Sequence, residues 1–224
     1  MGSELPKQFL PLEGKPVLVH TVQRFLNFEG DLPVVLVLPS DHLKFWEQLA
    51  PGHLPAKDLA RVHLTPGGKT RTDSVQAGLE LMERLVADST AILVAIHDGV
   101  RPFAMPDLLN RAYLTAEKQG ASVACMPVKF SLRQQIVAGE SQPVDRSQFF
   151  EVQTPQTFRL SAILDCYHNR PDGTFTDDAS LYQLAGNAVA ICEGSYDNIK
   201  LTTPEDMAVG QDILTRQGLL DSDH

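Results

Sequence analysis

The segment His97–Pro102 places an acidic and a basic side chain at the end of an expected strand. An apolar run, Ala91–Ile96, stops at His97, and Asp98 and Arg101 follow it three residues apart. The run does not alternate in polarity, so it predicts a strand covered on both faces within a parallel α/β sheet. Ligands of such sheets bind beyond the carboxyl ends of the strands. The pair therefore suits either phosphate chemistry or a salt bridge that caps the sheet.

Three further stretches carry groups that could bind an anion. Gly67–Ser74 is a glycine turn leading into a helix N-terminus, where free N–H groups and the helix dipole favour anions or polar base edges. The alternative is ordinary turn chemistry, with Asp73 acting only as a helix cap. Lys7 near the chain start, and Asp197 and Lys200 just before the last expected helix, complete the set. Each of these charges, taken alone, is also compatible with a solvated surface.

The apolar periodicity predicts alternating strands and helices, which is typical of a doubly wound α/β sheet. The expected strands are Val34–Leu38, Val62–Leu64, Ala91–Ile96, Ala121–Met126 and Val189–Cys192. The expected helices span Leu18–Phe28, start at Asp41, surround Val75–Val86, span about Pro106–Gln119, start at Thr176–Asp178, and start at Thr203. With 224 residues, 43% of them hydrophobic, we expect a single domain over residues 1–224.

The pattern changes between about residues 127 and 153, where the sequence is polar and irregular. Ser131–Val137 and Gly139–Ser141 predict a hairpin that projects from the body. Apolar residues on it need a cover, and a second copy of the chain is the simplest one. They are Ile136, Val137, Phe149 and Phe150, and Arg146 and Thr154 flank the end of the hairpin.

Composition narrows the class of protein. The formal net charge of −9 disfavours nonspecific nucleic-acid binding, which needs a basic surface. No stretch reaches the roughly 18 apolar residues of a membrane span, and the N-terminus lacks a signal pattern, so we expect a cytoplasmic protein without membrane contact. The three cysteines show no metal-ligand spacing.

Six short motifs, taken together, point to one family. They are Pro6–Leu12, Gly67–Val75, His97–Pro102, Thr154–Gln156, Thr176–Ser180 and Asp197–Thr202. In order and approximate spacing the chain resembles the 2-C-methyl-D-erythritol 4-phosphate cytidylyltransferase family, the CTP-dependent enzymes of the non-mevalonate isoprenoid pathway. The resemblance covers nearly the whole chain. The combination is highly specific, whereas each motif alone is not.

The resemblance implies a Rossmann-like nucleotidyltransferase fold, and a dimer in which the arm at about 127–153 reaches the partner's active site. In that family methylerythritol phosphate attacks the α-phosphorus of CTP, pyrophosphate leaves, and Mg²⁺ is required. By match to its motifs, Lys7 and Lys200 would neutralise the transferring phosphate, with Lys7 also binding the nucleotide. Gly68 and Ser74 would read the cytosine, and Asp98 and Asp197 would lie by the metal. Asp98, Arg101, Thr154 and, from the partner's arm, Ser131 and Arg146 would hold the polyol phosphate.

The chain departs from the family pattern in three places. Lys69 stands where an acid often follows the glycine pair, which adds local positive charge. Phe130 and Ser131 stand where the arm usually has Asp and Thr, and Ser131 keeps the hydroxyl. The family also opens with an apolar strand and a glycine-rich loop ending in Arg-Met, and this chain begins at that Met. We therefore expect roughly 15–25 residues upstream of Met1, flanked by the strands Val34–Leu38 and Ala91–Ile96, and weak CTP binding and little activity without them.

Two alternative functions stay open. Relatives that use ribitol 5-phosphate share these motifs, and a substrate panel with CTP separates the two acceptors. A noncatalytic dimeric homologue without the triphosphate loop is the alternative from another class. Such a scaffold would give no magnesium-dependent heat with CTP. Among single residues, His97 could be only a packing residue at the strand end, and Thr176–Asp178 only a helix cap.

Overall fold

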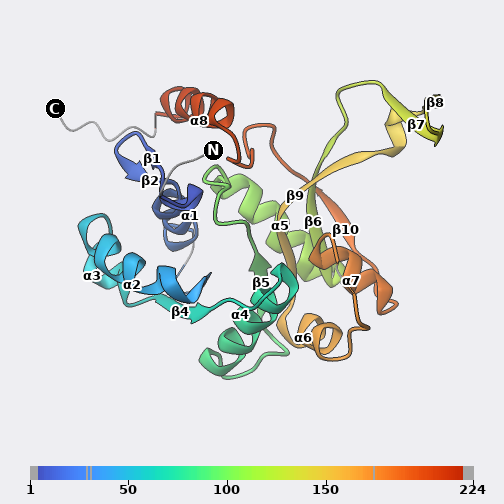
Figure 1. Cartoon of the computed structure of the whole chain (residues 1–224). Helices are drawn as coiled ribbons and strands as arrows, with labels where there is room; N and C mark the ends of the chain where they lie inside the picture. Colours follow the sequence, from blue (N-terminus) through green and yellow to red (C-terminus); the bar gives the residue numbers. More distant parts are fainter. Residues whose placement is uncertain (1–4, 29, 31, 174, 219–224) are drawn as a thin grey trace.

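The protein has an α/β body with a mixed central sheet (Figure 1). The structure is a computed structural model that describes residues 5–28, 30, 32–173 and 175–218. The central sheet has four strands in the order β10-β6-β9-β5. Their bounds are β5 (Leu93–Ile96), β6 (Ala121–Pro127), β9 (Phe150–Arg159) and β10 (Ala190–Glu193). A second, two-stranded sheet pairs β3 (Val34–Leu38) with β4 (Val62–Pro66) in parallel.

The sequence predicts that the strand at Ala91–Ile96 lies in a parallel sheet. This is wrong for β5, because the strand that pairs with it, β9, is antiparallel. Strand β9 runs antiparallel to both β5 and β6, and only β6 and β10 are parallel within this sheet. The strand itself begins at Leu93 and is half-buried rather than covered on both faces. Strand β9, which returns from the arm, was not expected. Its residues Gln153–Gln156 are mostly polar and do not show the apolar pattern of a buried strand, although they are buried.

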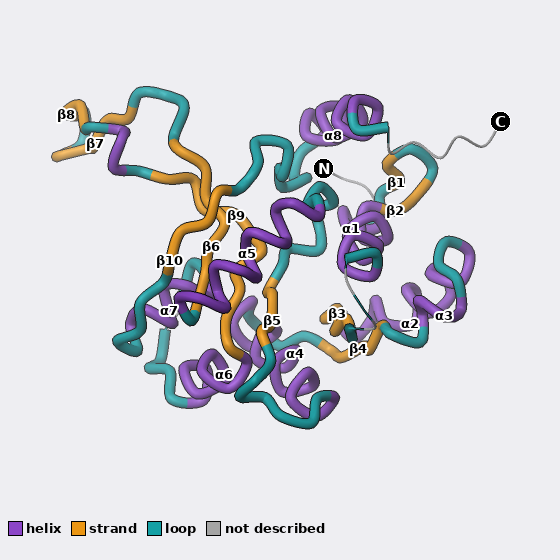
Figure 2. The backbone as a smooth tube through the Cα atoms, turned by 180° about the vertical axis from the view of Figure 1, so that it is seen from behind, coloured by secondary structure: helices purple, strands orange, loops and turns teal. Residues whose placement is uncertain are grey.

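Helices cover both faces of the central sheet (Figure 2). Helix α5 (Pro106–Gln119) lies across one face, where Leu108 and Ala112 pack near Ala124 and Cys192. The opposite face is covered by α4 (Arg71–Leu85), α6 (Leu160–His168) and α7 (Asp178–Leu184). Helix α6 was not expected. Strands whose two faces are both covered need apolar side chains on both faces, which explains the apolar runs in the sequence. Helices on both faces of the sheet confirm the doubly wound Rossmann-like fold.

The small sheet has its own core. Leu36 and Leu38 of β3 pack against Val22 and Trp46, which belong to α1 (Val17–Leu26) and α2 (Ser40–Leu49). The remaining short elements of this half are η1 (Lys7–Phe9), β1 (Pro11–Leu12), β2 (Lys15–Pro16), η2 (Ala50–Gly52) and α3 (Ala56–Leu59). Helix α4 packs on the other face of β3 and β4, so it bridges the two sheets.

The two sheets are not joined by a strand in the described part of the chain. Strand β5 pairs only with β9, and β3 pairs only with β4, so one edge of each has no strand partner among residues 5–218 as described. These are the two strands expected above to flank the upstream strand. That expectation concerns residues before Met1 and stays a prediction.

An arm leaves the body between β6 and β9 and ends in a hairpin (Figure 1). The hairpin pairs β7 (Leu132–Val137) with β8 (Glu140–Val144), and η3 (Arg146–Gln148) leads back to the body. The expected hairpin is thus confirmed. Its apolar side chains are exposed, with Phe130 at 77%, Ile136 at 58% and Val137 at 55%.

The last helix, α8 (Pro204–Arg216), begins as its sequence predicts. The Thr203 hydroxyl accepts a hydrogen bond from the Asp206 N–H at 3.2 Å, and the Asp206 carboxylate accepts one from the Thr203 N–H at 2.8 Å. This reciprocal pair satisfies donors that the first turn leaves without helical partners. No helix among the described residues is long and apolar enough to cross a membrane.

Candidate active site

Asp98 lies between two cations directly after β5. Its Oδ2 atom is 3.0 Å from Arg101 Nε and 3.1 Å from Lys200 Nζ. Burial alone would raise the pKa of Asp98, but the charge of Lys200, and the charge and hydrogen bond of Arg101, outweigh it. The pKa of Asp98 therefore lies below its usual value, and the side chain is an anion at neutral pH. The cluster confirms that Asp98, Arg101 and Lys200 meet in one place.

Thr154 joins this cluster from β9. Its hydroxyl accepts a hydrogen bond from the Asp98 N–H at 3.1 Å, and its carbonyl accepts one from Asn198 Nδ2 at 2.7 Å. Arg101 Nη1 in turn donates to the Asn198 carbonyl at 2.8 Å. Three segments far apart in sequence, the loop after β5, strand β9 and the loop before α8, are thus tied together by buried polar groups.

His97 packs at the strand end, as its structural interpretation predicts. Its ring lies 4.9 Å from that of Phe25, and Nε2 is 2.9 Å from the Arg101 carbonyl. Burial lowers the pKa of His97 to about 4, so the ring is neutral at pH 7. His97 thereby supports the Asp98–Arg101 turn without adding charge to it.

The glycine turn before α4 brings Gly68 and Ser74 into contact. The Gly68 N–H donates to Ser74 Oγ at 3.1 Å, and Ser74 Oγ donates to the Thr70 carbonyl at 2.8 Å. A Cβ at Gly68 would lie 2.3 Å from the Asp73 Cβ, so only glycine allows the turn to close this tightly. Asp73 caps α4 together with Thr70, which confirms its expected structural role.

A buried ion pair, which sequence reasoning missed, fixes the start of α4. Arg71 donates two hydrogen bonds, of 2.9 and 2.7 Å, to the Asp178 carboxylate, which is fully buried. Tyr167 Oη donates to the same carboxylate at 2.5 Å. Asp177, not Asp178, caps α7. The adjacent acids Asp177 and Asp178 were the signal that could have revealed this pair. Only one of them can cap the helix, so the other needs a different partner.

The pair also connects the glycine turn with the Asp98 cluster electrostatically. Burial opposes the charge on Arg71, but Asp178 and, more weakly, Asp98 raise the pKa of Arg71 above its usual value. Arg71, at the start of α4, therefore interacts weakly with the charge of Asp98.

Among the expected site residues, Lys7 and Asp197 lie apart from the cluster and make no ion pair or hydrogen bond with Asp98 in the described structure. Lys7 is exposed in η1, which is held against α2 by the packing of Phe9 on Phe45. Asp197 faces α8, where its two oxygens accept hydrogen bonds from Arg216 and Gln217, each at 3.2 Å. No three His, Cys, Asp or Glu side chains cluster as a metal site in the described ranges.

Ser131 and Arg146 lie on the arm, which extends away from the body (Figure 1). Arg146 donates to the Lys129 carbonyl, and the Lys129 ammonium stands 3.2 Å from the centre of the Tyr196 ring. A shallow pocket of about 380 Å³ lies at this base of the arm. Because Tyr196 precedes Asp197, the base of the arm contacts the loop that carries Lys200.

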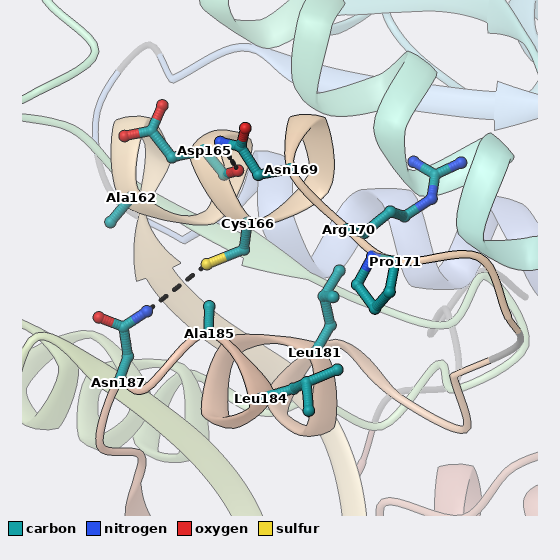
Figure 3. A pocket seen from close by; sticks show the side chains of 10 residues that line it. All are labelled: Ala162, Asp165, Cys166, Asn169, Arg170, Pro171, Leu181, Leu184, Ala185 and Asn187. Carbon is teal, nitrogen blue, oxygen red and sulfur yellow. Dashed lines mark hydrogen bonds between the residues drawn. The ribbon is translucent and has the colours of Figure 1, made fainter.

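A larger pocket, of about 440 Å³, lies between α6 and α7 (Figure 3), and none of Asp98, Arg101 and Lys200 lines it. Cys166 and Leu181 line it, and Arg170 stands at its rim with its guanidinium directed toward α4. There Arg170 Nη2 lies 2.8 Å from Asp73 Oδ1, which adds a second ion pair to the start of α4. The pocket is thus linked to the start of α4 through Arg170, and none of the expected site residues lines it.

A doubly wound α/β body with cations around an acid beyond β5, and a glycine turn before α4, has the architecture of a nucleotidyltransferase. Comparison with known proteins agrees. The family model described as 2-C-methyl-D-erythritol 4-phosphate cytidylyltransferase matches residues 1–216. The chain belongs to this family.

Relatives of this chain carry that same name. One from Bacteroides thetaiotaomicron is 40% identical over 215 residues, covering 96% of this chain and 93% of the relative. One from Porphyromonas gingivalis is 40% identical over 217 residues, covering 96% and 92%. Among solved structures, the enzyme of that name from Thermus thermophilus is 30% identical with a TM-score of 0.74, covering 94% of each chain. A 4-diphosphocytidyl-2C-methyl-D-erythritol synthase from Anaerococcus prevotii is 25% identical with a TM-score of 0.81, covering 96% of this chain and 92% of that one.

Proposed function

We propose that this protein transfers the cytidylyl group of CTP to 2-C-methyl-D-erythritol 4-phosphate. A phosphate oxygen of the acceptor attacks the α-phosphorus of CTP, and the bond from the α-phosphorus to its bridging oxygen breaks. Pyrophosphate leaves with the bonding electrons, and a new P–O–P linkage forms. The observation that carries this proposal is the Asp98–Arg101–Lys200 cluster, held by Thr154, in a chain 40% identical to enzymes of this name.

The chemistry needs alignment and charge neutralisation rather than a covalent enzyme intermediate. Lys200, whose side chain is 43% exposed, would move its ammonium between Asp98 and the transferring phosphate. Arg101 is held in place by Asp98 and the Asn198 carbonyl, and would bind the acceptor phosphate together with Thr154. Lys7 makes no ion pair in the described structure and would be available to the triphosphate.

Gly68 and Ser74 would read the cytosine. Their mutual hydrogen bond already fixes the turn, so the base would meet a preformed edge rather than a flexible loop. Preformed sites lose less entropy on binding, which favours recognition of a small polar base.

Mg²⁺ fits the donors at Asp98. This ion commonly binds one or two carboxylates together with substrate phosphate oxygens, and Arg101 and Lys200 both contact Oδ2 of Asp98, which leaves Oδ1 for a metal. When bound, the ion would neutralise charge on the triphosphate. Asp197 is the second candidate ligand, and it would have to give up its contacts with Arg216 and Gln217.

A homodimer would complete the site through the arm. The arm exposes Phe130, Ile136 and Val137, and no described segment of the body covers them. Placed across a two-fold interface, Ser131 and Arg146 would reach the acceptor phosphate of the partner chain. The protein would not bind nucleic acid nonspecifically, since the net charge of −9 disfavours such binding.

Release of pyrophosphate tests the proposal. The protein is purified in its 224-residue form and in a form that includes any residues encoded upstream of Met1. Each form is assayed with CTP and Mg²⁺ and with methylerythritol phosphate or ribitol 5-phosphate as the acceptor, and we expect the first acceptor to have the higher kcat/KM in the active form. A preference for ribitol 5-phosphate would reassign the acceptor. No turnover with either acceptor, together with no magnesium-dependent heat on CTP titration, would favour a noncatalytic homologue.

A further inference from the structure

Gln153 is a buried glutamine at the point where β9 passes from the arm into the central sheet. Opposite it, the pairing of β6 with β9 shifts register between Val123 and Cys125. Such an irregularity takes residues out of the regular alternation of a strand. Gln153 is 8% exposed and Thr154 is 6% exposed, so both neighbouring side chains are buried here. None of the expected site residues includes Gln153.

The side-chain amide of Gln153 holds the loop that leads to Lys200. Its Nε2 donates to the Ser195 carbonyl at 2.8 Å, and its Oε1 accepts from the Ser195 N–H at 3.2 Å. The same oxygen accepts from Asn198 Nδ2 at 3.2 Å. The amide thus pairs with Ser195 as a neighbouring strand would, and it also binds the buried Asn198.

The chain around Gly194 is shaped for this contact. A Cβ at Gly194 would lie 2.6 Å from Gln153 Oε1 and 3.2 Å from the Cys125 carbonyl. Only glycine therefore lets the loop approach Gln153 this closely. Arg111 Nη2 also donates to the Gly194 carbonyl at 3.1 Å, which holds the start of the loop.

Lys200 lies between two anchored points of this loop. On one side Asn198 is held by Gln153, Thr154 and Arg101. On the other side the Leu201 N–H donates to the Val100 carbonyl at 2.9 Å. Loss of the Gln153 contacts would release the first anchor while leaving the second intact.

We infer that Gln153 is a positioning residue that sets the place of Lys200 for phosphoryl transfer. This inference rests on the proposed function. A misplacement of about 1 Å can reduce a rate on the order of 100-fold, so Gln153→Met, which keeps the size of the side chain but removes the amide, should lower kcat roughly 10- to 100-fold. The KM for CTP should change less than about threefold, because the Gly68–Ser74 turn is untouched.

A double-mutant cycle separates positioning from general damage. If Gln153 acts through Lys200, Gln153→Met should have little further effect on kcat in a Lys200→Met background, because residues that act as one unit are not additive. The matched control is Gln156→Met, a buried glutamine three residues along the same strand that binds the Asp178 and Ala179 N–H groups instead. If Gln156→Met lowers kcat, it should lower kcat by the same factor in the Lys200→Met background as in the wild type, because Gln156 does not hold the Lys200 loop.

Hydrogen exchange gives a readout that does not depend on turnover. Gln153→Met should speed amide exchange in residues 195–199 about tenfold or more, whereas Gln156→Met should do so around residues 178–181. If Gln153→Met does not fold, Gln153→Glu replaces it, since a carboxylate keeps the size but cannot donate to Ser195. A wild-type protein that is inactive both in its 224-residue form and in a form that includes any residues encoded upstream of Met1 would refute the proposed function, while the exchange comparison would still decide on Gln153. Unchanged exchange in residues 195–199, or an undiminished kcat effect in the Lys200→Met background, would overturn the inference.

Discussion

Lys200 Nζ lies 3.1 Å from Asp98 Oδ2, and the same oxygen is 3.0 Å from Arg101 Nε. One carboxylate oxygen thus holds two cations that come from different loops. Asp98 thereby holds the side chains of Arg101 and Lys200 at the site and partly neutralises their charge. An incoming phosphate would compete with Asp98 for the ammonium of Lys200, which is the more exposed of the two cations.

Removal of the Lys200 charge should depress turnover and spare folding. We expect Lys200→Met to lose on the order of 100-fold or more in kcat, since it removes one electrostatic stabiliser of the transition state. Its Tm should stay close to that of the wild type, because the ammonium is partly exposed and the stem is kept. Steady-state pyrophosphate release and thermal melts check this. More than half of the wild-type kcat would contradict the role.

Acidification should destabilise the protein through His97. Unfolded histidine binds a proton below about pH 6.5, whereas folded His97 has a pKa lowered to about 4 by burial. Unfolding therefore takes up a proton in this window, and the free energy of unfolding falls as the pH falls from 6.5 toward 4. Between pH 7.5 and pH 5 the contribution is about 2 kcal/mol.

Urea unfolding of His97→Phe at the two pH values measures this contribution. The variant loses the hydrogen bond to the Arg101 carbonyl at every pH, so its stability is lower throughout. The difference between pH 7.5 and pH 5 should nevertheless shrink by the amount given above. Asp98 does not interfere, because its lowered pKa removes stability only at pH values below the usual aspartate range. An unchanged difference would exclude His97 as the source.

Activity should belong to the dimer. If the arm serves the partner's site, mixing an Arg146→Ala chain with a Lys200→Met chain should restore one competent site per heterodimer. That site would combine Lys200 from one chain with Arg146 from the other. Differently tagged chains allow the heterodimer to be isolated and assayed against both parent homodimers. No recovery in verified heterodimers would show that the two residues act within one chain or that Arg146 is dispensable.

The Arg71–Asp178 pair should contribute strongly to stability. Asp178→Ala leaves the buried Tyr167 hydroxyl without its acceptor and removes the partner of Arg71, whose side chain is 40% exposed, so we expect a loss of roughly 2–3 kcal/mol. The adjacent Asp177→Ala is the matched control. It removes the cap of α7 and a hydrogen bond from Gln156 Nε2 at 3.3 Å, which together cost about 1–2 kcal/mol. Chemical unfolding of both variants gives the comparison, and equal losses would mean that the buried pair adds nothing beyond a cap.

The sequence by itself determined the elements whose signals are local. Pro106–Gln119 and the helix after Thr203 follow from helix-start chemistry and apolar spacing. The hairpin follows from the runs Ser131–Val137 and Gly139–Ser141, in a polar segment that departs from the α/β pattern. Family motifs were enough to select Asp98, Arg101, Thr154 and Lys200 as one site, and the structure confirms that they meet. Roles that depend on bound substrate, metal or a partner chain, such as those of Lys7, Ser131, Arg146 and Asp197, stay predictions.

Only the tertiary structure decided the antiparallel course of β9 and the partners of Gln153, Asn198 and Asp178. Strand β9 pairs with β5 and β6, which precede it by many residues, and its polar residues are buried because distant loops satisfy them. The local sequence around a glutamine or aspartate does not reveal whether its side chain is buried or exposed. What distinguishes them is a hydrogen-bond partner far along the chain, and that partner is set by how the layers pack rather than by any local pattern.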